Sequence, residues 1–138
     1  MKNVILTIAF LFSIAFGFAQ DNGITITVTV DNLTSDKGNA SFSLHTANTF
    51  MKGAGIKNAS SEIKNGKAIV TFTNVKPGEY AILGMHDANE NGKMDFRENG
   101  MPLESFGTSN NVMAFGPPQY DEAKFKVEDK DLNLKIRF

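Results

Sequence analysis

The stretch Ile24-Thr25-Ile26-Thr27-Val28-Thr29-Val30 decides the fold class of this chain. Apolar and hydroxyl side chains alternate along it. Successive side chains of a strand point to opposite faces of a sheet, so this alternation is typical of a strand with one face in a core. The stretch therefore predicts a half-buried strand at residues 24–30.

The same period of two recurs along most of the remaining chain. Further segments with alternating apolar residues are residues 40–45, 67–73, 123–127 and 132–138. Residues 79–86 are apolar on both faces, which favours a strand in the centre of a sheet. About seven short strands with turn signals between them predict an all-β fold, a single β-sandwich with one long irregular loop.

Two turn sequences predict which strands are neighbours. Asp36-Lys37-Gly38-Asn39 lies between the first two predicted strands and indicates a hairpin. Asn65-Gly66 is the stronger signal, because both central positions of such a turn need positive φ. It would join a short strand near residues 62–64 to residues 67–73. Residues 47–60, rich in Gly, Asn, Ala and Ser, are expected to form a loop.

The N-terminus has the pattern of a secretory signal. Lys2 supplies positive charge, a mainly apolar run follows, and Gly17-Phe18-Ala19 puts small residues where a signal peptidase cleaves. The alternative is a membrane anchor, but the run is shorter than the roughly 20 residues of a spanning helix. We expect a signal peptide at residues 1–19, cleavage before Gln20, and one domain at residues 20–138 in the periplasm or outside the cell.

Composition excludes several kinds of site. The chain has 138 residues, no cysteine, two histidines and a net charge of −1. Without cysteine, neither disulfides nor zinc sites of the usual His/Cys type are expected. The charges are mixed, and nothing resembles the basic stripe that nucleic-acid binding requires. The chain also lacks a Gly-x-Ser-x-Gly elbow and a phosphate-binding loop.

The clearest motif follows the predicted central strand. It reads Asp87-Ala88-Asn89-Glu90-Asn91-Gly92-Lys93-Met94-Asp95-Phe96-Arg97-Glu98 and fills every specified position of the calcium-loop pattern D-x-[DN]-x-[DN]-G-x5-E. Calcium takes about six to eight oxygen ligands, which alternate residues of a tight loop can direct at one centre. The expected ligands are the side chains of Asp87, Asn89, Asn91, Asp95 and Glu98 and the carbonyl of Lys93. The alternative is an Asn-Gly turn in a polar loop, because helical flanks are missing.

The segment from residue 87 to residue 121 is long and irregular. Such a connection in a small domain is usually functional or held by something, and a bound ion would hold it. Its exposed-surface candidates are Phe106, Met113, Phe115 and Tyr120. The alternative is that these side chains cover the core beneath the loop.

Four motifs carry a resemblance to a known family. They are Pro77-Gly78-Glu79-Tyr80-Ala81, His86-Asp87-Ala88-Asn89-Glu90-Asn91-Gly92-Lys93-Met94-Asp95, Gly100-Met101-Pro102-Leu103-Glu104-Ser105-Phe106-Gly107-Thr108-Ser109-Asn110-Asn111 and Gly116-Pro117-Pro118-Gln119-Tyr120-Asp121-Glu122-Ala123-Lys124-Phe125. With these motifs the chain resembles the exported bacterial family known as domain of unknown function 2141. The resemblance implies the bacterial envelope or exterior and an immunoglobulin-like or transthyretin-like sandwich, and it carries over no activity. Glu98 is not part of the family pattern, so Glu104 is the alternative closing ligand.

Three functions remain open. The first is a non-catalytic envelope module whose loop is folded by calcium and whose surface binds an unknown protein or glycan. The second is a metal-assisted hydrolase that uses His86 with Glu98 or Glu104. The third is a small outer-membrane β-barrel, suggested by the alternating strand that ends at Phe138, although most strands are shorter than the roughly 9–11 residues required. We expect the first, with no catalysis and no membrane span after signal cleavage.

Four further features have simpler predictions. His86 is expected to orient the loop by a hydrogen bond at the strand end, and His45 is expected to be exposed. Tyr80 is expected to pack at a strand start and bond a neighbouring backbone group. Ser109-Asn110-Asn111 is expected to make turn hydrogen bonds.

Overall fold

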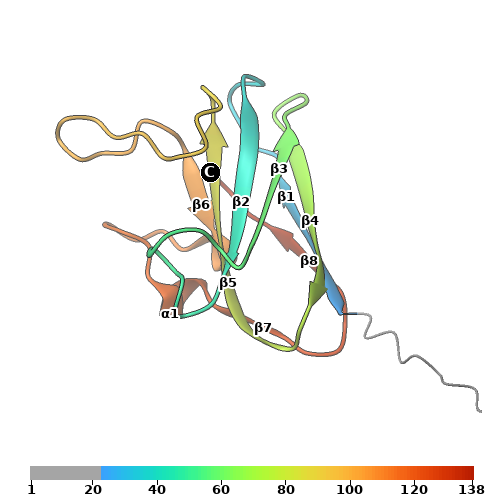
Figure 1. The fold of residues 1–138 in the computed structure, drawn as a ribbon. Helices are drawn as coiled ribbons and strands as arrows, with labels where there is room; N and C mark the ends of the chain where they lie inside the picture. Colours follow the sequence, from blue (N-terminus) through green and yellow to red (C-terminus); the bar gives the residue numbers. More distant parts are fainter. Residues whose placement is uncertain (1–22) are drawn as a thin grey trace, which may run out of the picture.

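The structure, a computed structural model, describes residues 23–138, so the predicted signal peptide at residues 1–19 lies outside the described residues. Figure 1 shows the arrangement of the strands and of one short helix. The strands are β1 (Ile24–Val30), β2 (Asn39–His45), β3 (Lys57–Glu62), β4 (Ala68–Val75), β5 (Gly78–Asp87), β6 (Phe106–Thr108), β7 (Phe125–Val127) and β8 (Leu132–Lys135). A 3₁₀ turn, η1 (Ser109–Asn111), and a helix, α1 (Tyr120–Ala123), lie between β6 and β7.

These strands form two open sheets, which confirms the predicted all-β sandwich. One sheet has the order β4-β1-β8, and the other has the order β3-β2-β5-β6. β7 pairs with residues 78–80 at the start of β5, whereas β6 pairs with residues 83–85 nearer its end. Neither sheet closes on itself, so the described strands do not form the closed fold of the third alternative in the sequence analysis. The short β6 lies in the segment expected to be irregular.

The hydrophobic core lies between the two sheets. Ile26, Val28 and Val30 of β1 are fully buried, as the alternation predicted. They belong to one cluster with Phe42 and Ile82, which come from the other sheet. Burying a side chain of this kind contributes about 1.5–3 kcal/mol relative to leaving it exposed.

The predicted hairpin between the first two strands is wrong, because β1 and β2 lie in different sheets. β1 pairs with β4 instead, and Ile26 lies opposite Phe72. The Asp36 carboxylate helps to fix the loop after β1. It accepts hydrogen bonds from the backbone N–H groups of Asn65 at 2.9 Å and Gly66 at 2.8 Å. Asp36, which was predicted to be part of a local turn, thus bonds the Asn65-Gly66 turn much later in the chain.

The Asn65-Gly66 turn forms as predicted, with φ of 53° and 73° at its two residues. Lys64 and Lys67 exchange backbone hydrogen bonds of 2.9 and 3.1 Å across it. The strands on its two sides nevertheless separate, since β3 pairs with β2 and β4 pairs with β1. The turn leads the chain from one sheet to the other. β3 also begins inside residues 47–60, which were expected to form a loop.

β5 is the central strand that residues 79–86 predicted, because it pairs with β2 and with both β6 and β7. Near its start Tyr80 is buried, and its hydroxyl donates a hydrogen bond of 2.8 Å to the carbonyl of Lys76. This contact confirms the packing role predicted for Tyr80. No helix within residues 23–138 is long and apolar enough to cross a membrane.

Candidate functional site

β5 positions the first residue of the calcium-type motif. Asp87 is its last residue, and its side chain is only 2% exposed. The carboxylate accepts two backbone hydrogen bonds, from Asn91 N–H at 3.1 Å on Oδ1 and from Gly92 N–H at 2.8 Å on Oδ2. Asp87 therefore folds the loop back over the end of the strand, and φ of 76° at Gly92 is the left-handed conformation that glycine adopts readily.

The two asparagines of the motif face the same carboxylate. Each Oδ1 accepts a hydrogen bond from the backbone N–H two residues later, as in Asx turns. Asn89 Oδ1 accepts from Asn91 N–H, and Asn91 Oδ1 accepts from Lys93 N–H. Each Nδ2 donates to Oδ2 of Asp95, at 2.7 Å for Asn89 and 2.8 Å for Asn91. Four predicted ligands are thus linked in one hydrogen-bonded cluster, because Asp87 and Asn89 both accept from Asn91 N–H.

A hairpin arm, defined here as residues 95–103, begins at this cluster. Leu103 N–H donates to the carbonyl of Asp95 at 2.8 Å, and Arg97 N–H donates to the carbonyl of Met101 at 2.8 Å. Gly100 N–H closes the tip by donating to the carbonyl of Arg97 at 2.8 Å. Glu98 lies in this tip and is exposed. In Figure 1 the arm is part of the yellow loop that projects beyond β5 and β6.

Glu104 lies at the base of the arm, next to the cluster. Its Oε2 accepts a hydrogen bond of 3.2 Å from the backbone N–H of Asp95. Its Oε1 is buried and has no hydrogen-bond partner in the described chain. A buried carboxylate oxygen without a partner is costly, and an ion or a water usually satisfies it.

The carboxylates of Asp87, Asp95 and Glu104 are not gathered around one centre. Across residues 23–138, no group of three or more His, Cys, Asp or Glu side chains is arranged to hold a metal ion. A site at this loop would therefore need the amide and carbonyl oxygens of the motif in addition to Asp87, Asp95 and Glu104. It would also need a movement of these side chains toward a common ion.

His86 is buried next to the motif. Its Nε2 lies 2.7 Å from the carbonyl oxygen of Lys37, and its backbone N–H donates to the carbonyl of Ser105 at 2.9 Å. A carbonyl oxygen only accepts, so Nε2 carries the proton in this contact. The ring bonds the loop before β2 and not the calcium-type loop that it was expected to orient.

The expectation that His45 is exposed is wrong, because its side chain is 2% exposed. Its Nδ1 lies 3.2 Å from the hydroxyl of Thr49, and its ring meets Phe50 edge-on at a centroid distance of 5.8 Å. Burial lowers the pKa of His45 below its ordinary value. Phe50 also packs against Ala81 and Ala123, so a second small apolar cluster covers this end of β2.

The prediction that Ser109-Asn110-Asn111 makes turn hydrogen bonds is wrong, because these side chains bond distant segments of the chain. Buried Ser109 Oγ accepts from Ile82 N–H at 2.9 Å and donates to the carbonyl of Ala123 at 2.5 Å. Asn111 Nδ2 donates to the carbonyl of Lys135 at 2.9 Å. These bonds tie β5, α1 and β8 together.

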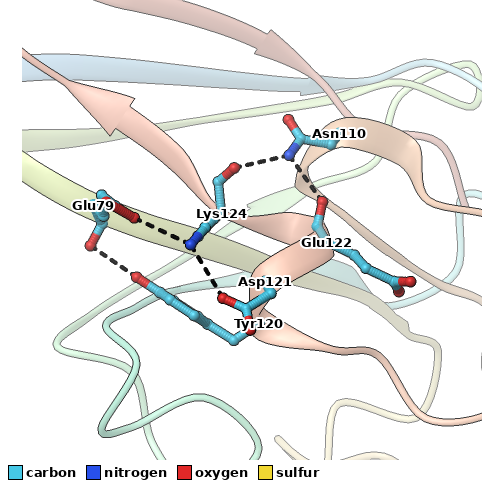
Figure 2. A network of polar contacts seen from close by, with 6 residues as sticks. All are labelled: Glu79, Asn110, Tyr120, Asp121, Glu122 and Lys124. Atoms are coloured by element: carbon cyan, nitrogen blue, oxygen red, sulfur yellow. Dashed lines mark hydrogen bonds and ion pairs between the residues drawn. The ribbon is translucent and has the colours of Figure 1, made fainter.

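Figure 2 shows the polar contacts that continue from Asn110 to the start of β5. Asn110 Nδ2 donates to the carbonyls of Glu122 at 3.0 Å and Lys124 at 2.9 Å. The Lys124 ammonium pairs with Asp121 at 3.1 Å and with Glu79 at 3.6 Å, and these carboxylates raise its pKa. The network holds α1 against β5.

A groove of about 1210 Å³ lies over the face of the β3-β2-β5-β6 sheet that points away from the core. The hairpin arm and residues 114–118 line it from two sides, and in Figure 1 both segments project to the same side of β5. Phe106 and Phe115 line it, and Met113 is exposed on the adjoining loop. Tyr120 differs from these three candidate surface residues, because it is partly buried against Phe50 at 5.7 Å. The sequence reasoning missed Phe96 and Met101, which are large apolar residues at exposed positions of the arm.

The model of a family described as an uncharacterized protein conserved in bacteria (DUF2141) matches residues 28–135. No curated protein and no solved structure matches the chain.

Proposed function

The chain belongs to the DUF2141 family of bacterial proteins, and from this premise we propose that it is an exported, non-catalytic β-sandwich module whose long loop binds calcium. The observation that carries the proposal is the buried Oε1 of Glu104, which lacks a partner beside the Asp95 cluster. A cation at this point would satisfy that oxygen. The proposed ligand atoms are carboxylate, amide and carbonyl oxygens, which suit a hard cation such as calcium.

The proposed ligands are the side chains of Asp87, Asn89, Asn91, Asp95 and Glu104 and the carbonyl of Lys93. Glu104 is preferred to Glu98 as the closing ligand, because it already bonds the backbone of Asp95 while Glu98 lies exposed in the arm tip. An ion would hold the loop after β5 and the base of the arm at the same place. Its role here is structural.

The expected stabilisation is substantial. Outside a cell calcium is often about millimolar. For a site with a dissociation constant of about 10 μM, the free calcium concentration would then be about 100 times the dissociation constant. Such saturation adds about 2.7 kcal/mol to the free energy of unfolding. This is a large share of the roughly 5–15 kcal/mol that a domain of this size has in total.

Calorimetric titration with calcium tests the proposal directly. We expect binding heat with calcium and a melting temperature that rises when calcium replaces a chelator. Magnesium should have a weaker effect, because it gives up its waters reluctantly. The Asp95→Asn variant should lose the calcium response, and Asp121→Asn on α1 is the matched control that should keep it. If the wild-type protein shows no heat and melts identically with chelator and with excess calcium, the loop is only a turn.

Export is the second element of the proposal, and it rests on the signal pattern of residues 1–19. Mass spectrometry of the protein from its native host should find Gln20, possibly cyclised, as the first residue. Met1 retained in the membrane fraction would contradict this element without affecting the calcium site.

The contacts of His86 support a non-catalytic role. A hydrolase that used His86 would need a ring nitrogen free to exchange protons with the substrate or with water. The ring is buried, and its Nε2 donates to the carbonyl of Lys37. We therefore do not propose the hydrolase.

A further inference from the structure

The methionines within residues 23–138 are concentrated at one surface. The chain has six, and five of them fall within residues 23–138. Four line the groove, and they are Met51, Met85, Met94 and Met101. The fifth, Met113, is fully exposed on the loop that also carries Phe115. Methionine side chains are flexible and polarizable, and they recur at surfaces that adapt to apolar partners of different shapes.

The strand register gives the groove floor two different halves. On its outer face Ser60 of β3 lies opposite Ser41 of β2, which lies opposite Met85 of β5. Met85 in turn lies opposite Phe106 of β6. The floor therefore changes from hydroxyl groups on β3 and β2 to apolar side chains on β5 and β6.

The walls of the groove are apolar and exposed. Phe96 and Met101 on the hairpin arm are 60% and 59% exposed, and Phe115 on the opposite loop is fully exposed. Large apolar side chains gathered at one exposed surface mark an interaction site, and aromatic residues are the usual anchors of such sites.

The groove lining contains one charged side chain. Lys93 is the single Lys, Arg, Asp or Glu side chain among the groove residues. It takes part in none of the ion pairs formed by residues 23–138. An otherwise neutral groove with one free cation is complementary to an apolar segment that carries one acidic residue.

We propose that this groove binds an amphipathic peptide segment with an acidic residue that pairs with Lys93. The groove volume of about 1210 Å³ exceeds the roughly 300–1,000 Å³ typical of small-molecule sites, so a polymer segment fits it better than a small ligand. Apolar side chains of the segment would contact the Met and Phe walls. Its backbone amides would reach the serine hydroxyls of the floor. The inference rests on the proposed function, because one wall is the arm whose base holds the calcium ligands.

Fluorescence anisotropy tests the proposal with purified, calcium-loaded protein. The probe is a short fluorescein-labelled peptide that alternates leucine and serine and carries one central aspartate. We expect saturable binding that weakens about tenfold in Phe115→Ser and in Met101→Gln. Ile69→Ser is the matched control, because Ile69 is 48% exposed on β4 of the other sheet and should leave binding unchanged.

A charge exchange tests the role of Lys93. Lys93→Glu should weaken binding of the aspartate peptide and strengthen binding of the same peptide with lysine in place of aspartate. Equal binding of both peptides by wild type and Lys93→Glu would overturn the acidic part of the proposal.

Three outcomes would overturn the proposal as a whole. The first is no anisotropy change with a protein that shows calcium heat; this would leave the proposed calcium function standing. The second is a dimer by analytical ultracentrifugation that Phe115→Ser dissociates, since a second copy would then cover the groove. The third is binding to phosphatidylglycerol vesicles, but not to the peptide, that Phe115→Ser abolishes. If the protein binds the peptide but gives no heat on titration with calcium, the proposed calcium site is overturned and the proposed peptide-binding groove stands.

Discussion

The backbone N–H of Asp95 lies 3.2 Å from Oε2 of Glu104 and donates a hydrogen bond to it. This bond closes the base of the hairpin arm, since Leu103 N–H bonds the carbonyl of the same Asp95. The other carboxylate oxygen of Glu104 is buried without a partner. Asp95 and Glu104 therefore lie where the calcium-type loop meets the hairpin arm that forms one wall of the groove. A cation bound there would hold both the loop and the arm in place.

Glu104→Gln should weaken calcium binding by at least about tenfold, which corresponds to about 1.4 kcal/mol. The amide would keep the shape of the side chain and remove the charge that closes the proposed site. Glu98→Gln is the matched control, and it should bind calcium as wild type does because Glu98 is exposed in the arm tip. Calorimetry on the three proteins decides the closing ligand, and the reverse pattern would assign that role to Glu98.

His45 should make the domain less stable in acid. Burial lowers the pKa of His45, so the unfolded chain takes up a proton near pH 6.5 and the folded protein only at lower pH. Below about pH 6.5 the unfolded state therefore binds more protons, and the free energy of unfolding falls as pH falls. Above that pH the contribution is complete and constant.

The measurement is a series of urea unfolding curves between about pH 7.5 and pH 5.5. His45→Gln should show a shallower decline than wild type across this window. An identical decline in both proteins would mean that other groups cause the acid sensitivity.

Ser109→Ala should lower the free energy of unfolding by about 1–3 kcal/mol. The substitution leaves Ile82 N–H and the carbonyl of Ala123 without their buried partner. Ser105→Ala, at an exposed position, should change stability by less than about 0.5 kcal/mol. Urea denaturation compares the variants, and a loss for Ser109→Ala no larger than the control would show that water replaces the hydroxyl.

Gly66→Ala should destabilise the domain by about 1–3 kcal/mol. Gly66 has φ of 73°, and an added Cβ would lie 2.6 Å from the carbonyl oxygen of Leu33. Gly100→Ala separates strain from collision, because Gly100 has φ of 81° and open space around the added Cβ. Thermal melting should rank Gly66→Ala below Gly100→Ala, and equal melting temperatures would mean that the loop of Leu33 moves aside.

The sequence by itself determined the local features of this protein. The alternation from Ile24 to Val30 placed a half-buried strand, because the side-chain period of a strand is a property of the backbone alone. Asn65-Gly66 predicted its turn, because positive φ depends on the identity of those two residues. The spacing from Asp87 to Asp95 likewise marked a loop rich in oxygen donors, because all of its members lie within one short segment.

Only the tertiary structure decided which segments meet. The predicted hairpin between the first two strands did not form, and beyond the Lys64–Lys67 bridge the strands that flank Asn65-Gly66 pair with other strands. The choice between pairing with a neighbour and crossing to the other sheet depends on the whole core. His45 was expected to be exposed, but Phe50 and Thr49 cover it at the end of β2. The groove between the hairpin arm and Phe115 also joins segments that no local pattern connects. These features depend on how separate segments of the chain pack together, and the sequence period of a single strand carries no information about that packing.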